Sequence, residues 1–200
     1  VNFLLLPWPL RVRESDFRPV EGSVQRLERD PLGFFEFAPS ERLDLDLLDR
    51  VLTAARDEVD GVDVVVLPES AVDESELDDL EAVLNHHGVI YLTAGVRQSS
   101  PRRGRFGENW VHAGVNPRLG KGGGPPDGPG HQWFHIRQNK HHRRSLDEAQ
   151  ITQYHLGGVL HPHVRWWEAM EVPRRAMQFV ELAELTQASL VCEDLAQNDD

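Results

Sequence analysis

The stretch VDVVVLP, residues 62–68, is the strongest indication of the fold that the chain is expected to adopt. It is a continuous, mostly β-branched apolar run that ends at Pro68, which is typical of a strand buried on both faces. The flanking stretches LDLDLLDRVLTAARDEV (43–59) and DESELDDLEAVLNHHG (73–88) have the apolar spacing and end signals of helices. VIYLTAGV (89–96) is a second buried strand. This alternation predicts an α/β domain built in layers.

The rest of the chain adds short strands and one helix. SLDEAQITQYHL (145–156) is predicted as a helix that opens with a capping box of Ser145 and Glu148. Segment 13–41 is expected to be irregular, and segment 165–172 shows no clear preference for helix or strand. The further predicted strands are FLLL (3–6), NWVHAGV (109–115), HQWFHIRQNK (131–140), AMQFVEL (176–182) and ASLVC (188–192). A Gly/Pro-rich surface loop at 116–130 is expected to join two of them into a hairpin.

Composition narrows the classes of protein to which the chain can belong. Its 200 residues suffice for one medium domain with its own core. The formal net charge of −12 argues against a nucleic-acid-binding surface, which needs a basic footprint, although KHHRRS (140–145) is a local basic tract. A single cysteine excludes an internal disulfide framework and a cysteine-rich zinc site, and it favours a reducing cytosol.

The two ends of the chain predict neither a signal peptide nor a membrane anchor. The opening VNFLLLPWPL lacks the basic region and cleavage site of a signal peptide. No run reaches the ~18 apolar residues that a membrane helix needs. We therefore expect a soluble, cytoplasmic protein. Because Val1 is not a start methionine and the chain stops soon after Cys192, we also expect a fragment of a longer protein.

Three residues with complementary chemistry each follow an apolar strand. Glu69 comes after VVVLP, Lys140 after WFHIRQN and Cys192 after SLV. Because active sites of open α/β sheets gather outside the carboxyl ends of strands, we expect these side chains to meet. Together they can perform acyl transfer, in which Glu69 takes the thiol proton and the thiolate attacks. Lys140 and the backbone N–H of Glu193 are expected to stabilise the oxyanion, and Lys140 to lower the thiol pKa.

Each of these residues also has a purely structural interpretation. Glu69 alone would be an acid at a helix N-terminus, where the dipole favours it. Lys140 would be a solvated strand end, and Cys192 a buried packing residue. Their occurrence as one ordered set favours the catalytic interpretation over the structural one.

The segments VVVLPES, RQNKHH and LVCEDLA, in this order, resemble the three signatures of the carbon–nitrogen hydrolase (nitrilase) superfamily. The resemblance places Glu69, Lys140 and Cys192 at the family's catalytic positions. His142 falls on the histidine of its Lys-x-His stretch and Asp194 on the acid of its Cys-x-Asp stretch. The Cys-Glu-Asp run is similar to that of the glutaminase branch.

The resemblance implies a four-layer α-β-β-α sandwich that is truncated after the nucleophile strand. Residues 1–200 would then form one hydrolase domain that is incomplete at its C-terminus. The longer than usual gap before the cysteine motif implies an inserted segment at about 143–172. The family often has a second glutamate in this gap, for which Glu168 is the candidate, with Glu171 behind it.

The function that the resemblance implies is hydrolysis of a non-peptide amide or nitrile through a thioester acyl-enzyme. It implies no cofactor, a small-molecule substrate and an oligomeric assembly. The family commonly places an arginine or tryptophan after the acid, where this chain has LAQ (195–197), so amidase, nitrilase and glutaminase chemistry all stay open.

One divergent group looks more similar to this chain than the small-molecule amidases do. It consists of the nitrilase-like domains fused to reverse transcriptases in bacterial phage-defence systems. They are similar in a KHHR tract and a Cys-Glu-Asp-Leu-Ala run. A non-enzymatic or regulatory module of such a larger protein is the alternative function.

Ten histidines raise the question of a metal site. His161 and His163 form an H-x-H pair, and HH occurs at 86–87 and 141–142. Zinc sites need three or four ligands of defined geometry, and no motif with recognised ligand spacing is present. The sequence therefore predicts no metal.

Overall fold

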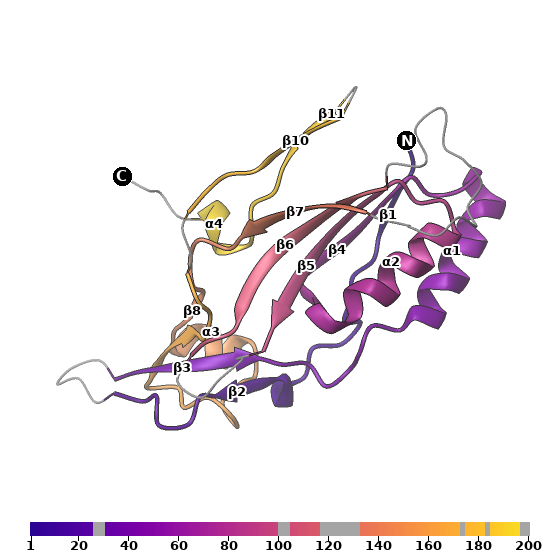
Figure 1. Ribbon diagram of the computed structural model, residues 1–200. Helices are drawn as coiled ribbons and strands as arrows, with labels where there is room; N and C mark the ends of the chain where they lie inside the picture. Colours follow the sequence, from indigo (N-terminus) through magenta and orange to yellow (C-terminus); the bar gives the residue numbers. More distant parts are fainter. Residues whose placement is uncertain (26–30, 100–104, 117–132, 173–174, 183–184, 197–200) are drawn as a thin grey trace.

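The computed structural model describes residues 1–25, 31–99, 105–116, 133–172, 175–182 and 185–196. These residues form a mixed α/β structure with a large sheet, a second sheet and a hairpin (Figure 1). The helices are α1 (Leu45–Val59), α2 (Leu77–His86), α3 (Glu148–Gln153) and α4 (Glu193–Ala196), with 3-10 turns η1 (Glu14–Asp16) and η2 (Glu74–Glu76). The predicted α/β class is confirmed.

The large sheet has the strand order β1-β4-β5-β6-β7. Its strands are β1 (Phe3–Leu5), β4 (Val64–Asp73), β5 (Tyr91–Gln98), β6 (Glu108–Val115) and β7 (Phe134–Asn139). β1, β4 and β5 are parallel, whereas β6 and β7 are antiparallel and form the predicted hairpin. The loop predicted within that hairpin lies, after Asn116, outside the described residues.

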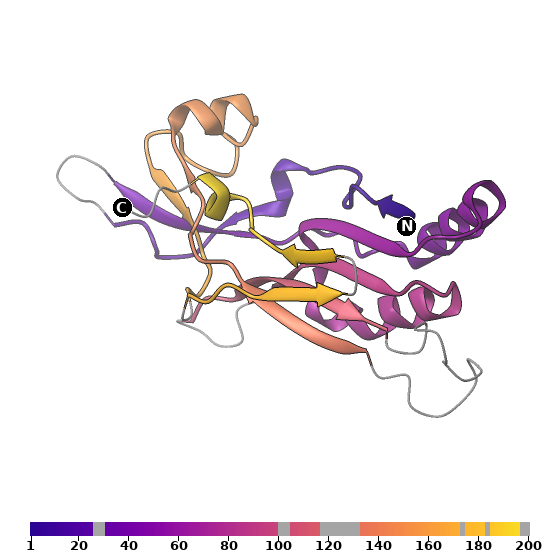
Figure 2. The same ribbon diagram turned by 90° about the horizontal axis from the view of Figure 1, so that it is seen from above.

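α1 and α2 cover one face of this sheet (Figures 1 and 2). α1 begins after Asp44, whose carboxylate accepts a hydrogen bond from the backbone N–H of Leu47 and caps the helix. The core between helices and sheet is made of apolar side chains that are at most 2% exposed: Leu48, Leu52, Val65, Leu80, Leu84 and Leu92. The amphipathic stripes seen in the sequence therefore face the sheet.

The opposite face of the large sheet contacts the hairpin of β10 (Phe179–Leu182) and β11 (Leu185–Ala188). Val180 packs there against Val64, Tyr91 and Ala113. The hairpin thereby brings the chain back along the sheet shortly before the cysteine.

The second sheet lies beyond the carboxyl ends of β4 and β5 (Figure 1). Its order is β2-β3-β9-β8, formed by β2 (Phe17–Pro19), β3 (Leu32–Phe37), β9 (Arg165–Glu168) and β8 (Ser145–Leu146). Ile151 of α3 packs with Phe35 and Trp166 in a separate small core. The segment 143–172, predicted as an insertion, thus supplies half of this sheet.

Two predictions in this region are wrong. Segment 13–41 is not irregular, because it contains η1, β2 and β3; β3 pairs with β9, far later in the chain, so local pattern does not reveal it. α3 begins after Asp147, whose carboxylate accepts from the backbone N–H of Gln150. The predicted cap Ser145 belongs instead to β8.

None of the helices in the described ranges has the length and apolarity needed to cross a bilayer.

Candidate active site

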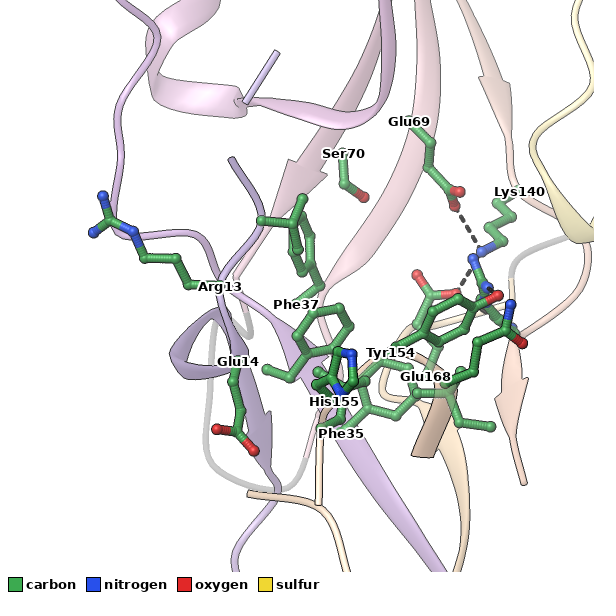
Figure 3. Close-up of a pocket in the computed structure, with 16 residues that line it drawn as sticks. Arg13, Glu14, Phe35, Phe37, Glu69, Ser70, Lys140, Tyr154, His155 and Glu168 are labelled. Carbon is green, nitrogen blue, oxygen red and sulfur yellow. Dashed lines mark hydrogen bonds and ion pairs between the residues drawn. The ribbon is translucent and has the colours of Figure 1, made fainter. Parts of the chain in front are cut away.

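Glu69 lies in a bulge inside β4 and not beyond the strand's end as predicted. β4 continues past Pro68, and its pairing with β5 is interrupted between Leu67 and Val72. Within the bulge Ser70 has a φ of 55°, a left-handed conformation that costs a non-glycine residue about 1–2 kcal/mol. Strain of this kind often accompanies functional sites. Figure 3 shows that the Glu69 carboxylate points toward Lys140.

Gly95 of β5 makes room for this bulge. A Cβ atom at Gly95 would lie 2.3 Å from the carbonyl oxygen of Pro68 and 2.4 Å from the Cα atom of Glu69. Any other residue would therefore displace the backbone that carries Glu69. A glycine inside a strand was the signal in the sequence, since it often marks a close backbone approach.

Lys140 directly follows β7, and its side chain is only 1% exposed, so it is not a solvated strand end. Its Nζ lies 2.7 Å from Glu69 Oε1 and 2.5 Å from Glu168 Oε2 (Figure 3). Burial acts to lower the pKa of Lys140, but the charges of Glu168 and Glu69 outweigh it and raise this pKa above its ordinary value. The lysine is therefore an ammonium ion that is fixed in place.

Asn109 and Glu168 complete the surroundings of this ammonium ion. The Asn109 amide Nδ2 donates to Glu69 Oε1 at 2.8 Å and to Glu168 Oε1 at 2.9 Å. Glu168, the last residue of β9, also accepts from the backbone N–H of Arg144 at 3.3 Å. Glu168 thus lies where the second glutamate was expected. Asn109 was not among the predicted site residues, because its only signal in the sequence is a polar residue at the start of a buried strand.

Cys192 lies on a turn immediately before α4. The predicted strand 188–192 is wrong: β11 spans Leu185–Ala188, and residues 189–192 are not in a strand. Cys192 has a φ of 47°, again left-handed, and its Sγ lies 3.8 Å from a guanidinium nitrogen of Arg144. The residue is exposed, so it is not a buried packing residue.

The charges of the other site residues shift the pKa of the Cys192 thiol. Partial burial of the sulfur raises the pKa of the thiol, and the charge of Glu69 raises it further. Lys140 and Arg144 act in the opposite direction, as predicted for Lys140, but they do not prevail. The thiol therefore needs a base before it can act as a nucleophile, since the thiolate is the reactive form.

Asp194 holds the turn that carries Cys192 against the segment that carries Lys140. Its Oδ1 accepts from the backbone N–H groups of His141 and His142, each at 2.9 Å. The ring nitrogen Nδ1 of His142 lies 3.0 Å from the same oxygen. Two residues predicted only as supporting, His142 and Asp194, thus connect the lysine and cysteine segments.

A cavity of about 460 Å³ opens beside the two carboxylates and Lys140 (Figure 3). Phe35 and Phe37 of β3 line it together with Tyr154, which follows α3. Arg144 also lines it, and its guanidinium group lies 5.5 Å from the centroid of the Tyr154 ring. The cavity is therefore built largely from the second sheet and presents aromatic walls.

The structure places two further candidates differently. Glu171 lies outside the cluster: its Oε1 accepts from the backbone N–H of Phe106 at 3.3 Å. Glu193 is the first residue of α4, and the first N–H groups of a helix have no partner within the helix.

The chain matches no profile of a known protein family and no curated protein sequence.

Proposed function

We propose that this chain is a carbon–nitrogen hydrolase domain of the nitrilase type, which cleaves a non-peptide amide or nitrile. The observation that supports this most is the buried Lys140 ammonium ion between Glu69 and Glu168. Cys192 lies within electrostatic reach of both Glu69 and Lys140. A base, a fixed cation and a thiol in one place are what acyl transfer to a cysteine needs.

In the acylation step, Glu69 takes the proton of the Cys192 thiol, and Sγ forms a bond to the amide carbon. The electron pair of the C=O bond moves to oxygen, where Lys140 and the backbone N–H of Glu193 stabilise the negative charge. When the C–N bond breaks, Glu69 gives its proton to the leaving nitrogen. Ammonia or an amine leaves, and a thioester remains on Cys192.

In the deacylation step, Glu69 takes a proton from water while the water oxygen adds to the thioester carbon. The C–S bond then breaks, the sulfur takes the proton back, and the carboxylic acid leaves. Asn109 and Glu168 are positioning residues, because they hold Glu69 and Lys140 rather than the reacting carbon.

We also propose that the large sheet belongs to a four-layer α-β-β-α sandwich. The face opposite α1 and α2 carries exposed apolar side chains on both edge strands: Phe3, Leu5 and Phe134 are 56%, 69% and 64% exposed. A second sheet or a second copy of the chain would bury these side chains, and exposed patches of this kind mark interaction surfaces. The same face supports the proposed oligomer.

The cavity supports a small organic substrate with an aromatic or other flat apolar group. Its volume lies within the roughly 300–1,000 Å³ of typical ligand sites. Phe35, Phe37 and Tyr154 offer ring contacts, and Arg144 offers a cation for a carboxylate or another anionic group.

Release of ammonia and acid from a panel of aryl amides and nitriles tests the proposal. We expect the wild-type protein to release both, Cys192→Ala to release neither, and intact-mass spectrometry to detect an acyl adduct that Cys192→Ala lacks. His163→Ala, a substitution of an exposed residue that does not line the cavity, is the matched control and should keep the activity. Equal release from wild type and Cys192→Ala would reject the hydrolase and favour the non-enzymatic module.

A further inference from the structure

Glu81, His112 and His135 form a second polar cluster, on the face of the large sheet that the helices cover. Glu81 comes from α2, His112 from β6 and His135 from β7. The Nε2 atoms of both histidines lie 2.9 Å from Glu81 Oε1. One ligand atom from each residue lies within 4.8 Å of the other two. Three segments that are distant in the sequence therefore bring potential metal ligands to one point.

This cluster is embedded in an otherwise apolar core. Glu81 and His112 are 8% and 6% exposed, whereas the side chain of His135, on the edge strand β7, is half-exposed. A carboxylate removed from water costs several kcal/mol unless its charge is compensated and its oxygens are hydrogen-bonded. A divalent cation bound by Glu81 and both histidines would compensate the charge of the carboxylate more fully than two N–H donors do.

Gly114 lies beside the donor atoms and has no side chain that could reach them. A Cβ atom there would lie 3.4 Å from His112 Nε2 and 3.5 Å from Glu81 Oε1, and 3.0 Å from the Trp133 ring. A larger residue would crowd the point where the three donors converge. The glycine therefore keeps a side chain away from the donor atoms.

We propose that Glu81, His112 and His135 bind a divalent transition-metal ion of the Zn²⁺ type. Two imidazole nitrogens and one carboxylate oxygen suit Zn²⁺, whose ligand bonds are roughly 2.0–2.2 Å long. Mg²⁺ and Ca²⁺ prefer sites made of oxygen alone. Three protein ligands leave one tetrahedral position for water, on the side where His135 is accessible to solvent.

The site is independent of the proposed hydrolase centre. Side chains alternate along a strand, so His112 and Gly114 face the helices while Asn109, which binds Glu69, faces the other way. Metal binding would link α2 to the β6–β7 hairpin. Failure of either proposal therefore leaves the other testable.

Titration of the chelator-treated, desalted protein with ZnCl₂ in a calorimeter tests the inference. We expect one equivalent of Zn²⁺ per chain and a higher Tm in its presence, because a ligand that binds the folded state stabilises it. His135→Ala removes a half-exposed ligand with little effect on folding and should weaken binding by at least about 100-fold. Glu81→Gln should weaken it similarly.

The matched control is His163→Ala. His163, like His135, has a histidine and a glutamate as neighbours, His161 and Glu148, but its side chain is exposed. This variant should bind Zn²⁺ as the wild type does. Co²⁺ provides a spectroscopic signature: His135→Cys should add a sulfur-to-cobalt charge-transfer band, and His163→Cys should not.

Absence of Zn²⁺ binding by the wild type would overturn the inference. So would binding that survives in both His135→Ala and Glu81→Gln, since the ion would then lie elsewhere. In either case the cluster would be a buried carboxylate that accepts hydrogen bonds from two imidazole rings.

Discussion

Among single residues, Lys140 is notable because its charged side chain is almost completely buried. Burying an ammonium ion requires close partners of opposite charge, and Glu69 and Glu168 provide them at 2.7 and 2.5 Å. Asn109 ties the two carboxylates together, so each side chain of the cluster constrains the next. The cation is thus held rigidly before a substrate arrives, which is the condition under which it stabilises an oxyanion most effectively.

At the same scale we predict opposite shifts of the Cys192 thiol pKa in two variants. Glu69→Gln removes a charge that raises this pKa, so the pKa should fall; Arg144→Gln removes a charge that lowers it, so the pKa should rise. The measurement is the rate of alkylation by iodoacetamide against pH, followed by intact mass, because the thiolate is the form that reacts.

Cys192 is the only cysteine, so the alkylation signal belongs to one site, and Cys192→Ala provides the blank. Shifts in the same direction in both variants would contradict the electrostatic surroundings described for the thiol.

At the level of secondary-structure elements, the bulge of β4 depends on Gly95 of β5, against which it packs. β4 is an interior strand that is parallel to β1 and β5, and the irregular pairing between Leu67 and Val72 turns Glu69 toward Lys140. The left-handed Ser70 belongs to the same distortion. Gly95 permits it, because no side chain fits between the two strands at that point.

We predict that Gly95→Ala destabilises the protein by about 1–3 kcal/mol and displaces Glu69, so that hydrolysis is lost even where the fold survives. Urea unfolding and ammonia release measure the two effects. Gly157→Ala is the control, since its Cβ would meet only Pro162, at 4.0 Å, and stability should change by less than about 0.5 kcal/mol. Normal activity in Gly95→Ala would show that the bulge does not need a glycine.

At the scale of the whole molecule, the cavity depends on how the second sheet meets the large one. Glu69 and Lys140 come from the large sheet, whereas Phe35, Phe37 and Tyr154 come from the second sheet and the helix packed on it. The proposed reacting groups and the proposed substrate-binding walls therefore belong to different parts of the fold. A substitution in the cavity walls should therefore have effects that can be separated from those of a substitution among the reacting groups.

We predict that Tyr154→Ala raises KM roughly tenfold and leaves kcat nearly unchanged, because an aromatic contact contributes to substrate binding and not to the chemical step. Steady-state kinetics on an aryl amide measure both constants. Met177→Ala, similarly exposed but outside the cavity lining, should leave both unchanged. A fall in kcat with KM unchanged would assign Tyr154 a role in the transition state instead.

Elements whose signals are local could be predicted from the residues alone. The apolar stripe of α1, the acids that open the region of α2 and the continuous apolar runs of β4 and β5 are each complete within a short stretch. The order of these elements then led to the α/β class. It also led to Glu69, Lys140 and Cys192 as candidates, because each follows an apolar run.

The residues that surround these candidates come together only when distant elements pack against one another. Strand β3 needs β9 as its partner, and Asn109 and Glu168 reach Lys140 only after the two sheets meet. Glu81, His112 and His135 likewise converge from three elements. The physical reason is that a contact between distant segments depends on how whole elements pack, which no local spacing of residues records.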